Sequence, residues 1–223
     1  MDMCQKCIHV NLYTSTHVYL YICIHVWYGM TMIISVVNAK GGVGKTTTCM
    51  YLAAAAAKQR PEWTVSVLDS DPQHSATDWY SLAEAVDDKP SFSLISKIDA
   101  LDFQYKADVL IVDTAPGNGV DIEKAVSMAD LVIVPTEAEP MSMARAKRTL
   151  DAAGRNGWLL LTKVRRRTRL WADTREAIRQ SGVRCFDTEI PDNMRYKGFA
   201  TNPSDLGAYS DLWLEIRSIL ERA

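Results

Sequence analysis

Residues 33–47 of the chain read IISVVNAKGGVGKTT, and this stretch decides the fold. It joins a β-branched apolar run to a glycine-rich loop, which leads through Lys45-Thr46 into an alanine-rich stretch with helical character. A strand, a glycine loop, Lys-Thr and a helix in this order form the context that a phosphate-binding loop requires. Glycines let backbone N–H groups turn inward around phosphate oxygens, and the helix N-terminus adds the positive end of its dipole. The stretch therefore predicts a nucleotide-binding P-loop.

The loop departs from the standard P-loop spacing at one end. The standard pattern has glycine at position 39, where this chain has Ala39, and an additional lysine, Lys40, stands ahead of the glycine pair. Lys45 is expected to reach the β- and γ-phosphates of a nucleotide, and the Thr46 hydroxyl is expected to ligate Mg²⁺. The loop residues predicted to bind the nucleotide are Lys40, Gly41, Gly42, Val43, Gly44, Lys45, Thr46 and Thr47.

Beyond the loop, apolar runs alternate with helical patterns. The runs that read as strands cover residues 33–37, 64–68, 108–112, 131–134 and 158–162, and the first helix is expected at 46–58. Short continuous apolar strands that alternate with helices indicate a parallel sheet covered on both faces. The predicted fold class is α/β, a P-loop NTPase with a mostly parallel central sheet flanked by helices on both faces. Ligands in such folds sit at the carboxyl ends of the strands.

Two further strand ends carry carboxylates. Residues 69–73 read DSDPQ, which by itself also suits a capped turn before a helix. Beside a phosphate loop, a carboxylate at this position can orient the attacking water and sense the γ-phosphate. Asp113 ends the run at 108–112, as in a Walker B strand, whose carboxylate holds Mg²⁺, usually through water. The three motifs together therefore predict one nucleotide and metal site.

The extra lysine and the order of the three motifs resemble the deviant Walker A proteins of the ParA/MinD group of P-loop ATPases. In that group the added lysine crosses a nucleotide-sandwiched dimer and contacts the ATP of the partner subunit, which implies a trans-acting Lys40. The DSDPQ segment looks like the switch motif of ParA-type partition ATPases more than that of the MinD branch. The resemblance implies that Asp71 activates water and that Asp69 supports the Mg²⁺ shell. The catalytic residues it implies are Lys40, Lys45 and Asp71, and the metal-site residues are Thr46, Asp69 and Asp113.

The resemblance extends over about residues 32–223. Residues 190–195 resemble the segment in which the family closes over adenine, which implies that Pro191 contacts the nucleotide. The residues before the first strand do not read as a helix-turn-helix domain, so we expect the small type, which leaves operator DNA to a partner. That partner would be a centromere-binding protein of the ParB-like or ribbon-helix-helix kind. The implied cofactors are ATP and Mg²⁺, and the implied assembly is a homodimer with ATP sandwiched between its subunits.

The charge of the chain is nearly balanced on average and uneven in detail. Lys plus Arg number 25 and Asp plus Glu 27, a net charge of −2 that argues against a wholesale DNA coat. Residues 163–197 nevertheless hold ten bases and five acids. Such a patch can bind DNA in a salt-dependent, sequence-blind way, although a solvated loop and helix face is the alternative. With the resemblance favouring DNA, the predicted DNA-binding residues are Arg165, Arg166, Arg167, Arg169, Arg195 and Lys197.

Residues 1–29 are a different kind of sequence, with three of the five Cys and three of the four His. Three interpretations compete: a zinc site based on Cys4 and Cys7, a signal peptide or anchor, and a low-complexity extension that is not native. The spacing after the Cys pair matches no standard zinc finger, and no small-residue cleavage site follows the apolar run. We favour the extension, and the predicted domains are therefore 1–29 and an ATPase domain at 30–223.

The chain contains no window of eighteen or more apolar residues, so no membrane span is expected. Residues 211–222 form an amphipathic pattern with both charge signs on the polar face. A membrane-surface helix favours a basic polar face, so this segment is expected to pack on the sheet.

The resemblance therefore implies a weak, partner-stimulated ATP hydrolase that is cytoplasmic and nucleoid-associated. It would drive plasmid or chromosome partition through ATP-dependent dimerisation and non-specific DNA binding. One alternative is a ParA-like positioning ATPase for a protein or membrane-associated cargo, and another is a nucleotide-binding switch with negligible turnover.

Overall fold

The computed structural model describes residues 7–9, 23–25, 31–96, 107–117, 120–197 and 201–222. The chain divides into two compact units, Met1–Met30 and Thr31–Ala223. In the first unit, β1 (Cys7–His9) and β2 (Cys23–His25) pair antiparallel, so that the two copies of the Cys-Ile-His repeat lie opposite each other. Cys4 and the side chains of both strands, on which the zinc interpretation depends, lie outside the described residues.

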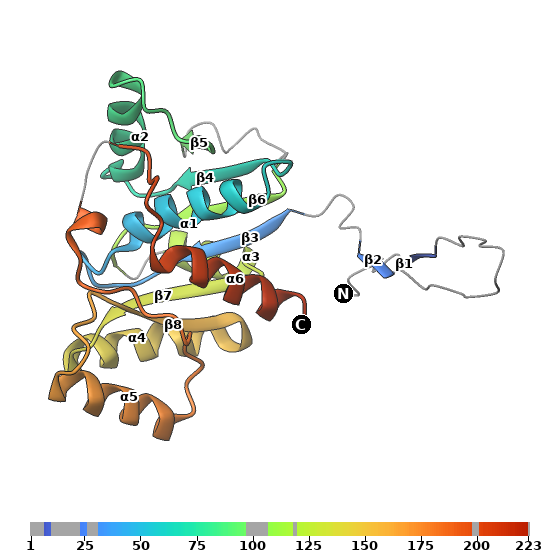
Figure 1. The fold of residues 1–223 in the computed structure, drawn as a ribbon. Coiled ribbons are helices and arrows are strands. Elements are labelled where there is room, and N and C mark those ends of the chain that lie inside the picture. The colour runs from blue at the N-terminus through green and yellow to red at the C-terminus, as the bar shows by residue number, and fades with distance from the viewer. Residues whose placement is uncertain are drawn as a thin grey trace. The chain divides into compact units, whose positions relative to one another are not determined.

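The second unit is built around a six-stranded sheet with the order β5-β4-β6-β3-β7-β8 (Figure 1). Each neighbouring pair of these strands is parallel, which confirms the predicted fold class. The strands are β3 (Met32–Val36), β4 (Val65–Asp69), β5 (Ser93–Ser96), β6 (Val109–Asp113), β7 (Leu131–Glu137) and β8 (Gly157–Thr162). Five of them were predicted, with bounds that differ by a few residues at most, and β5 was not.

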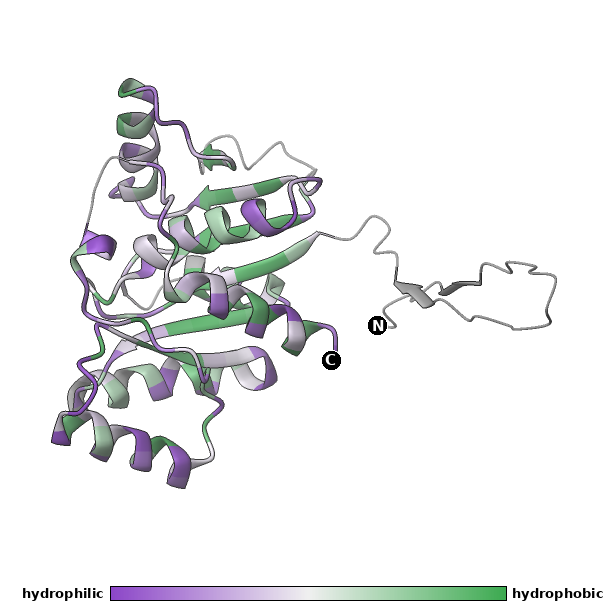
Figure 2. Cartoon of the chain, viewed as in Figure 1, coloured by the Kyte–Doolittle hydropathy of each residue, from purple (hydrophilic) through white to green (hydrophobic). Residues whose placement is uncertain are grey.

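The central strands are buried on both faces, as their continuous apolar sequences require. In β6, Val109 and Ile111 belong to the core on one face, whereas Leu110 and Val112 belong to the core on the other. Figure 2 shows the strands as the most hydrophobic part of this unit, with hydrophilic residues concentrated in the outer helices and loops. The alternating side chains of such a strand are therefore all buried, because each face of the sheet has its own core.

Helices cover both faces of the sheet (Figure 1). Residues of α1, α2 and α6 share one core with the sheet, and residues of α3, α4 and α5 pack in the cores of the opposite face. The helices are α1 (Lys45–Gln59), α2 (Ser75–Ala85), α3 (Val120–Met128), α4 (Pro140–Ala153), α5 (Arg169–Ser181) and α6 (Ala208–Leu220), with short 3₁₀ helices η2 (Gly154–Asn156) and η3 (Met194–Lys197).

The amphipathic pattern of the C-terminal segment predicted a helix packed on the sheet, and α6 packs against α1 in the core that covers one face of the sheet. Leu212, Trp213 and Ile216 are fully buried in the core that α6 shares with α1 and the sheet. Apolar burial of this kind gives α6 a structural role inside the domain. Among the described helices, none has both the length and the apolar character that a membrane span requires.

Candidate nucleotide site

The carboxyl ends of β3, β4 and β6 lie side by side in the sheet. Asp113, the last residue of β6, is in register with Val36 of β3 on one side and with Asp69 of β4 on the other. The glycine loop leaves β3 directly beyond this point and leads into α1. The fold therefore brings the three chemistry-bearing motifs of the sequence to one edge of the sheet.

The glycine loop needs glycine at two positions because of its backbone conformation. Gly42 has φ 74° and Gly44 has φ 91°, in the left-handed region that side chains rarely adopt. Gly44 is the N-cap of α1, and its carbonyl accepts the first helical hydrogen bond, from the Thr48 N–H at 2.9 Å. The N-terminus of α1 therefore lies at the end of the loop, and a helix N-terminus placed in this way can bind an anion.

One end of the loop is fastened to β7 by Asn38. The buried Asn38 side chain donates to the Pro135 carbonyl at 2.7 Å and accepts from the Lys40 N–H at 2.9 Å. Asn38 was not predicted as a site residue, because an asparagine before a glycine loop also reads as an ordinary turn residue.

The other side of the loop is fastened to the end of β8. Thr162 Oγ1 donates to the Val43 carbonyl at 2.9 Å, and Lys163 Nζ donates to the Gly42 carbonyl at 2.7 Å. From the sequence, Lys163 was only one of the bases in the stretch 163–197, whereas the structure places it against the phosphate loop. Its only sequence signal was its position directly after a strand.

Lys45 lies beneath the loop, close to the carboxylates. It is 7% exposed, and its Nζ donates to the Lys40 carbonyl at 3.3 Å. Burial lowers the pKa of Lys45, while the negative charges of Asp113 and Asp71 oppose that shift. A cation in this position suits the binding of an anionic ligand.

Asp113 is a buried carboxylate whose two oxygens have no hydrogen-bond partner among the described residues. Burial raises its pKa to about 7, and the neighbouring Asp69 and Asp71 charges add to the rise, against the opposing influence of Thr46 and Lys45.

An unpartnered buried carboxylate beside Thr46 fits the chemistry of a Mg²⁺ site. The described ranges hold no group of three His, Cys, Asp or Glu side chains arranged for a metal ion. Mg²⁺ is commonly held by one or two carboxylates together with phosphate oxygens and water.

Asp69 organises the loop that carries Asp71. One Asp69 oxygen accepts from the Asp71 N–H at 3.1 Å, and the other accepts from the Thr77 N–H and hydroxyl at 2.9 and 2.6 Å. Asp71 in turn accepts from the Gln73 N–H at 2.9 Å. Both aspartates are buried. Through these hydrogen bonds, Asp69 links the loop that carries Asp71 to Thr77 in the first turn of α2.

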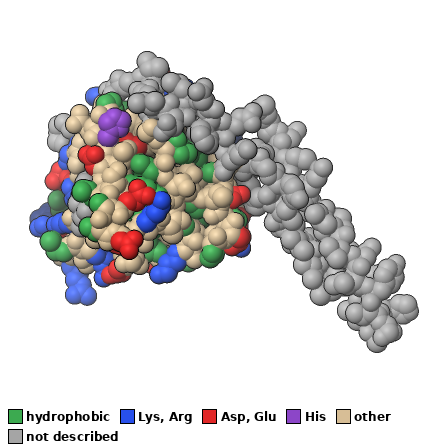
Figure 3. All heavy atoms as spheres, turned by 90° about the horizontal axis from the view of Figure 1, so that it is seen from above, with side chains coloured by type: hydrophobic (Ala, Val, Ile, Leu, Met, Phe, Trp, Pro, Cys, Tyr) green, Lys and Arg blue, Asp and Glu red, His purple; other side chains and the backbone are tan. Residues whose placement is uncertain are grey.

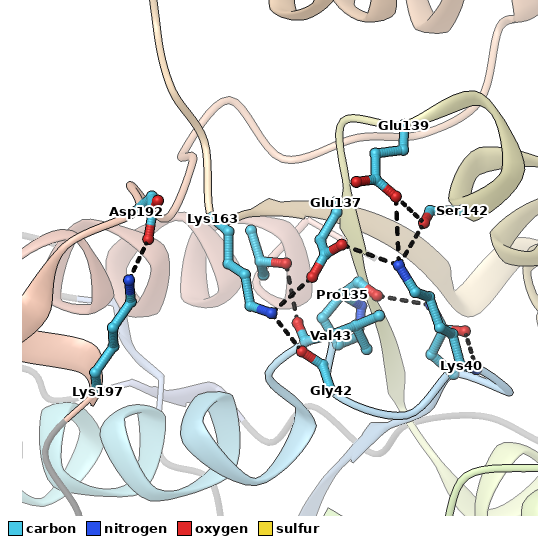
Figure 4. Close-up of polar contacts among 12 residues, drawn as sticks. Lys40, Gly42, Val43, Pro135, Glu137, Glu139, Ser142, Lys163, Asp192 and Lys197 are labelled. Carbon is cyan, nitrogen blue, oxygen red and sulfur yellow. Dashed lines mark hydrogen bonds and ion pairs between the residues drawn. The ribbon is translucent and has the colours of Figure 1, made fainter.

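Lys40 turns toward acceptors of its own subunit (Figure 4). Its Nζ lies 2.9 Å from Glu137 Oε2, 3.0 Å from Ser142 Oγ and 3.4 Å from Glu139 Oε2. The hydrogen bond from Lys40 to Glu137 raises the pKa of Lys40. Burial acts to raise the pKa of Glu137, but hydrogen bonds from Lys163 and Lys40 outweigh it, and the pKa is lowered.

Pro191 lies beside the end of β8, where Thr162 and Lys163 support the phosphate loop. It forms a β-bridge with Val164, the residue after Lys163. A cavity of about 300 Å³ opens here. Its lining consists of Val164, Arg166, Thr188, Glu189, Pro191, Ala208 and Asp211.

Five of the six predicted DNA-binding residues form ion pairs with carboxylates in the described part of the chain. Arg165 and Lys197 both bind Asp192, at 2.7 and 2.8 Å, and these two hydrogen bonds lower the pKa of Asp192. Arg166 instead binds Glu189 at 2.8 Å, a carboxylate whose side chain is 3% exposed and which also accepts from Trp171. Glu189 therefore links Arg166, in the loop before α5, to Trp171 of α5.

The other three predicted DNA-binding residues are exposed as well. Arg169 lies 3.6 Å from Asp173 with 95% of its side chain exposed, and Arg195 lies 2.9 Å from Asp205. Arg167 is exposed and adopts φ 66°. Among the described residues on the face drawn in Figure 3, acidic, basic and hydrophobic side chains are interspersed. The net positive charge of residues 163–197 is partly compensated by two acids outside the stretch, Asp205 beside Arg195 and Glu137 beside Lys163.

The fold and the loop define a P-loop nucleotide-binding protein. The family model described as "CobQ/CobB/MinD/ParA nucleotide binding domain" matches residues 34–201. "Maintenance of carboxysome distribution protein A" of Gloeobacter kilaueensis is 33% identical over 170 residues, which cover 71% of this chain and 76% of that protein. "Protein ParA" of Rhizobium radiobacter is 29% identical over 127 residues, 53% of this chain and 54% of that protein. The crystal structure of a plasmid partition protein from Borrelia burgdorferi matches with a TM-score of 0.64 at 20% identity, over 87% of this chain and 99% of that one.

The chain belongs to the CobQ/CobB/MinD/ParA nucleotide-binding family. It is a P-loop ATPase of the ParA/MinD type, and the resemblance inferred from the three motifs is confirmed.

Proposed function

We propose that this protein is a Mg²⁺-dependent ATPase that partitions plasmid or chromosomal DNA through ATP-dependent dimerisation and non-specific DNA binding. The observation that carries the proposal is the meeting of the P-loop, Lys40 and the carboxylates of adjacent strand ends at one edge of the sheet. A relative named ParA and a structural neighbour named as a plasmid partition protein support it. The protein would act in the cytoplasm on the nucleoid.

The residues of the site divide the work on the nucleotide. The loop N–H groups and Lys45 would hold the phosphates, and Pro191 would contact the adenine. Thr46 and Asp113 would hold Mg²⁺, and the bound ion would neutralise part of the phosphate charge. Asp69 fixes the loop on which Asp71 lies, and Asp71 orients the attacking water. Hydrolysis would be slow without a partner, since the site relies on positioning by one carboxylate.

Dimerisation and DNA binding would follow from ATP binding. Lys40 would contact the ATP of the partner subunit, where a second cation offsets the remaining triphosphate charge. The dimer would bind nucleoid DNA through the exposed arginines around Arg165–Arg169. Exposed ion pairs such as Arg169–Asp173 contribute little, so phosphates can replace the carboxylates at small cost. A centromere-binding protein, ParB-like or ribbon-helix-helix, would stimulate hydrolysis and release the ATPase from DNA.

Sedimentation velocity with and without ATP tests the dimer. The wild-type protein is expected to dimerise in ATP, and Lys45→Ala is expected to lose nucleotide binding and the dimer together. Lys40→Ala is expected to bind a fluorescent ATP analogue normally but to remain monomeric. A fully dimeric Lys40→Ala protein in ATP would overturn the trans role of Lys40.

A second candidate function is the positioning of a protein assembly by the same ATPase cycle. The observation that favours it is the 33% identity to a protein named for carboxysome distribution, of which 76% is covered. Deleting the gene distinguishes the two functions. Loss of a plasmid or of chromosome copies without selection supports partition, whereas faithful inheritance with a misplaced protein assembly supports positioning.

A further inference from the structure

Glu137, the last residue of β7, contacts two lysines with its two carboxylate oxygens (Figure 4). Oε2 lies 2.9 Å from Lys40 Nζ, and Oε1 lies 2.7 Å from Lys163 Nζ. Both lysines are attached to the phosphate loop, since Lys40 belongs to it and Lys163 also donates to the Gly42 carbonyl at 2.7 Å. A single carboxylate therefore fastens the loop from two sides.

These contacts occupy the ammonium group of Lys40 within its own subunit. An ammonium group has three N–H donors, and Lys40 has acceptors at Glu137, Ser142 and Glu139. Glu137 is the strongest of the three partners, because it is charged, lies at 2.9 Å and has only 18% of its side chain exposed. Glu139 lies farther away, at 3.4 Å, and 53% of its side chain is exposed. A lysine held in this way must leave Glu137 before it can reach a phosphate in another subunit.

We propose that Glu137 is a positioning residue that holds Lys40 against its own subunit, so that dimerisation requires Lys40 to exchange this carboxylate for a nucleotide phosphate. The inference rests on the proposed trans role of Lys40. When the conformation that can bind is only a fraction of the population, the apparent affinity falls by that fraction. Glu137 therefore sets the ATP concentration at which the dimer forms.

The test is Glu137→Gln, which keeps the size of the side chain and removes its charge. Sedimentation velocity across a range of ATP concentrations gives the midpoint of dimerisation. The midpoint is expected to fall about fivefold, the scale of one partly exposed ion pair. Structural damage at Glu137 would raise the midpoint instead, so the direction of the change separates positioning from folding.

Two control variants assign the effect to Lys40. Lys163→Met removes the support at Gly42 but leaves the Glu137–Lys40 contact, and it is expected not to lower the midpoint. In a Lys40→Ala background, Glu137→Gln is expected not to restore the dimer, because its effect passes through Lys40. The affinity of each variant for a fluorescent ATP analogue, measured in parallel, separates nucleotide binding from dimerisation.

The outcomes separate this inference from the proposed function. An unchanged or raised midpoint in Glu137→Gln, while Lys40→Ala stays monomeric, overturns only the role of Glu137. An equal fall in Lys163→Met also overturns it, since the loop support would then be responsible. A Lys40→Ala protein that dimerises like the wild type overturns the trans role itself, and with it this inference.

Discussion

Asp113 is a buried charge to which the described part of the fold gives no hydrogen-bond partner. We predict that Asp113→Asn raises the free energy of unfolding in EDTA at pH 8 by on the order of 2 kcal/mol, because a neutral amide costs less to bury than a carboxylate. Urea unfolding of the two proteins without nucleotide measures the difference. The exposed Asp151→Asn is the matched control and should change stability little.

The sign of the pH dependence follows from the raised pKa of Asp113. The folded-state value of about 7 lies above the ordinary 3.8, so between these values the folded protein keeps a proton that the unfolded chain has lost. The wild-type stability from this group is therefore present at low pH and is lost as pH rises through about 7. The advantage of Asp113→Asn should grow from pH 5 to pH 8, and an equal advantage at both would contradict the prediction.

At the scale of elements, the junction of η3 with α6 depends on Gly207. This residue has φ 50°, and a Cβ there would overlap the Tyr196 hydroxyl, which accepts from the Ala208 N–H at 2.9 Å. We predict that Gly207→Ala destabilises the protein by about 2–4 kcal/mol through backbone strain and the clash. Urea unfolding again gives the value.

The control for that substitution is Gly182→Ala at the C-cap of α5. Gly182 has φ 66°, but a Cβ there would meet no atom within 4 Å. Its cost should be about 1 kcal/mol, from the left-handed backbone alone. Equal costs at Gly182 and Gly207 would mean that Tyr196 moves aside freely and that the junction is not tightly packed.

Elements with strong local signals could be predicted from the sequence, and elements without them could not. The strand of β3, the glycine loop and α1 follow one another within thirty residues, and each has its own residue pattern. β5 was missed because its residues Ser93–Ser96 are half-exposed and lack a continuous apolar run. The supports of the loop were also missed, because Thr162 and Val43 are 119 residues apart in the chain and no local pattern links them.

At the scale of the whole molecule, the net charge of residues 163–197 predicted a basic surface, but it did not predict which of these bases form ion pairs with carboxylates. The sequence showed the excess of bases at 163–197, but it could not show which base each of the five acids in that stretch binds. Asp192 holds two of the bases, and the buried Glu189 makes Arg166 part of the packing. Arg167 is exposed, and Arg165 and Arg169 keep 78% and 95% of their side chains exposed despite their ion pairs, so we select these three cations to test DNA binding.

Binding to random-sequence duplex DNA in ATP tests this selection. Replacing Arg165, Arg167 and Arg169 together by Ala should lower the steepness of log affinity against log salt by about 0.9 for each phosphate contact that is lost. Arg166→Ala should instead lower thermal stability, because it leaves the buried Glu189 without its closest cation, and should change the salt slope less. Arg155→Ala, an exposed base at the other end of β8, is the control. If the triple variant keeps the wild-type slope between about 50 and 200 mM salt, DNA binds elsewhere, since a surface that supplies phosphate contacts must release counterions when it binds.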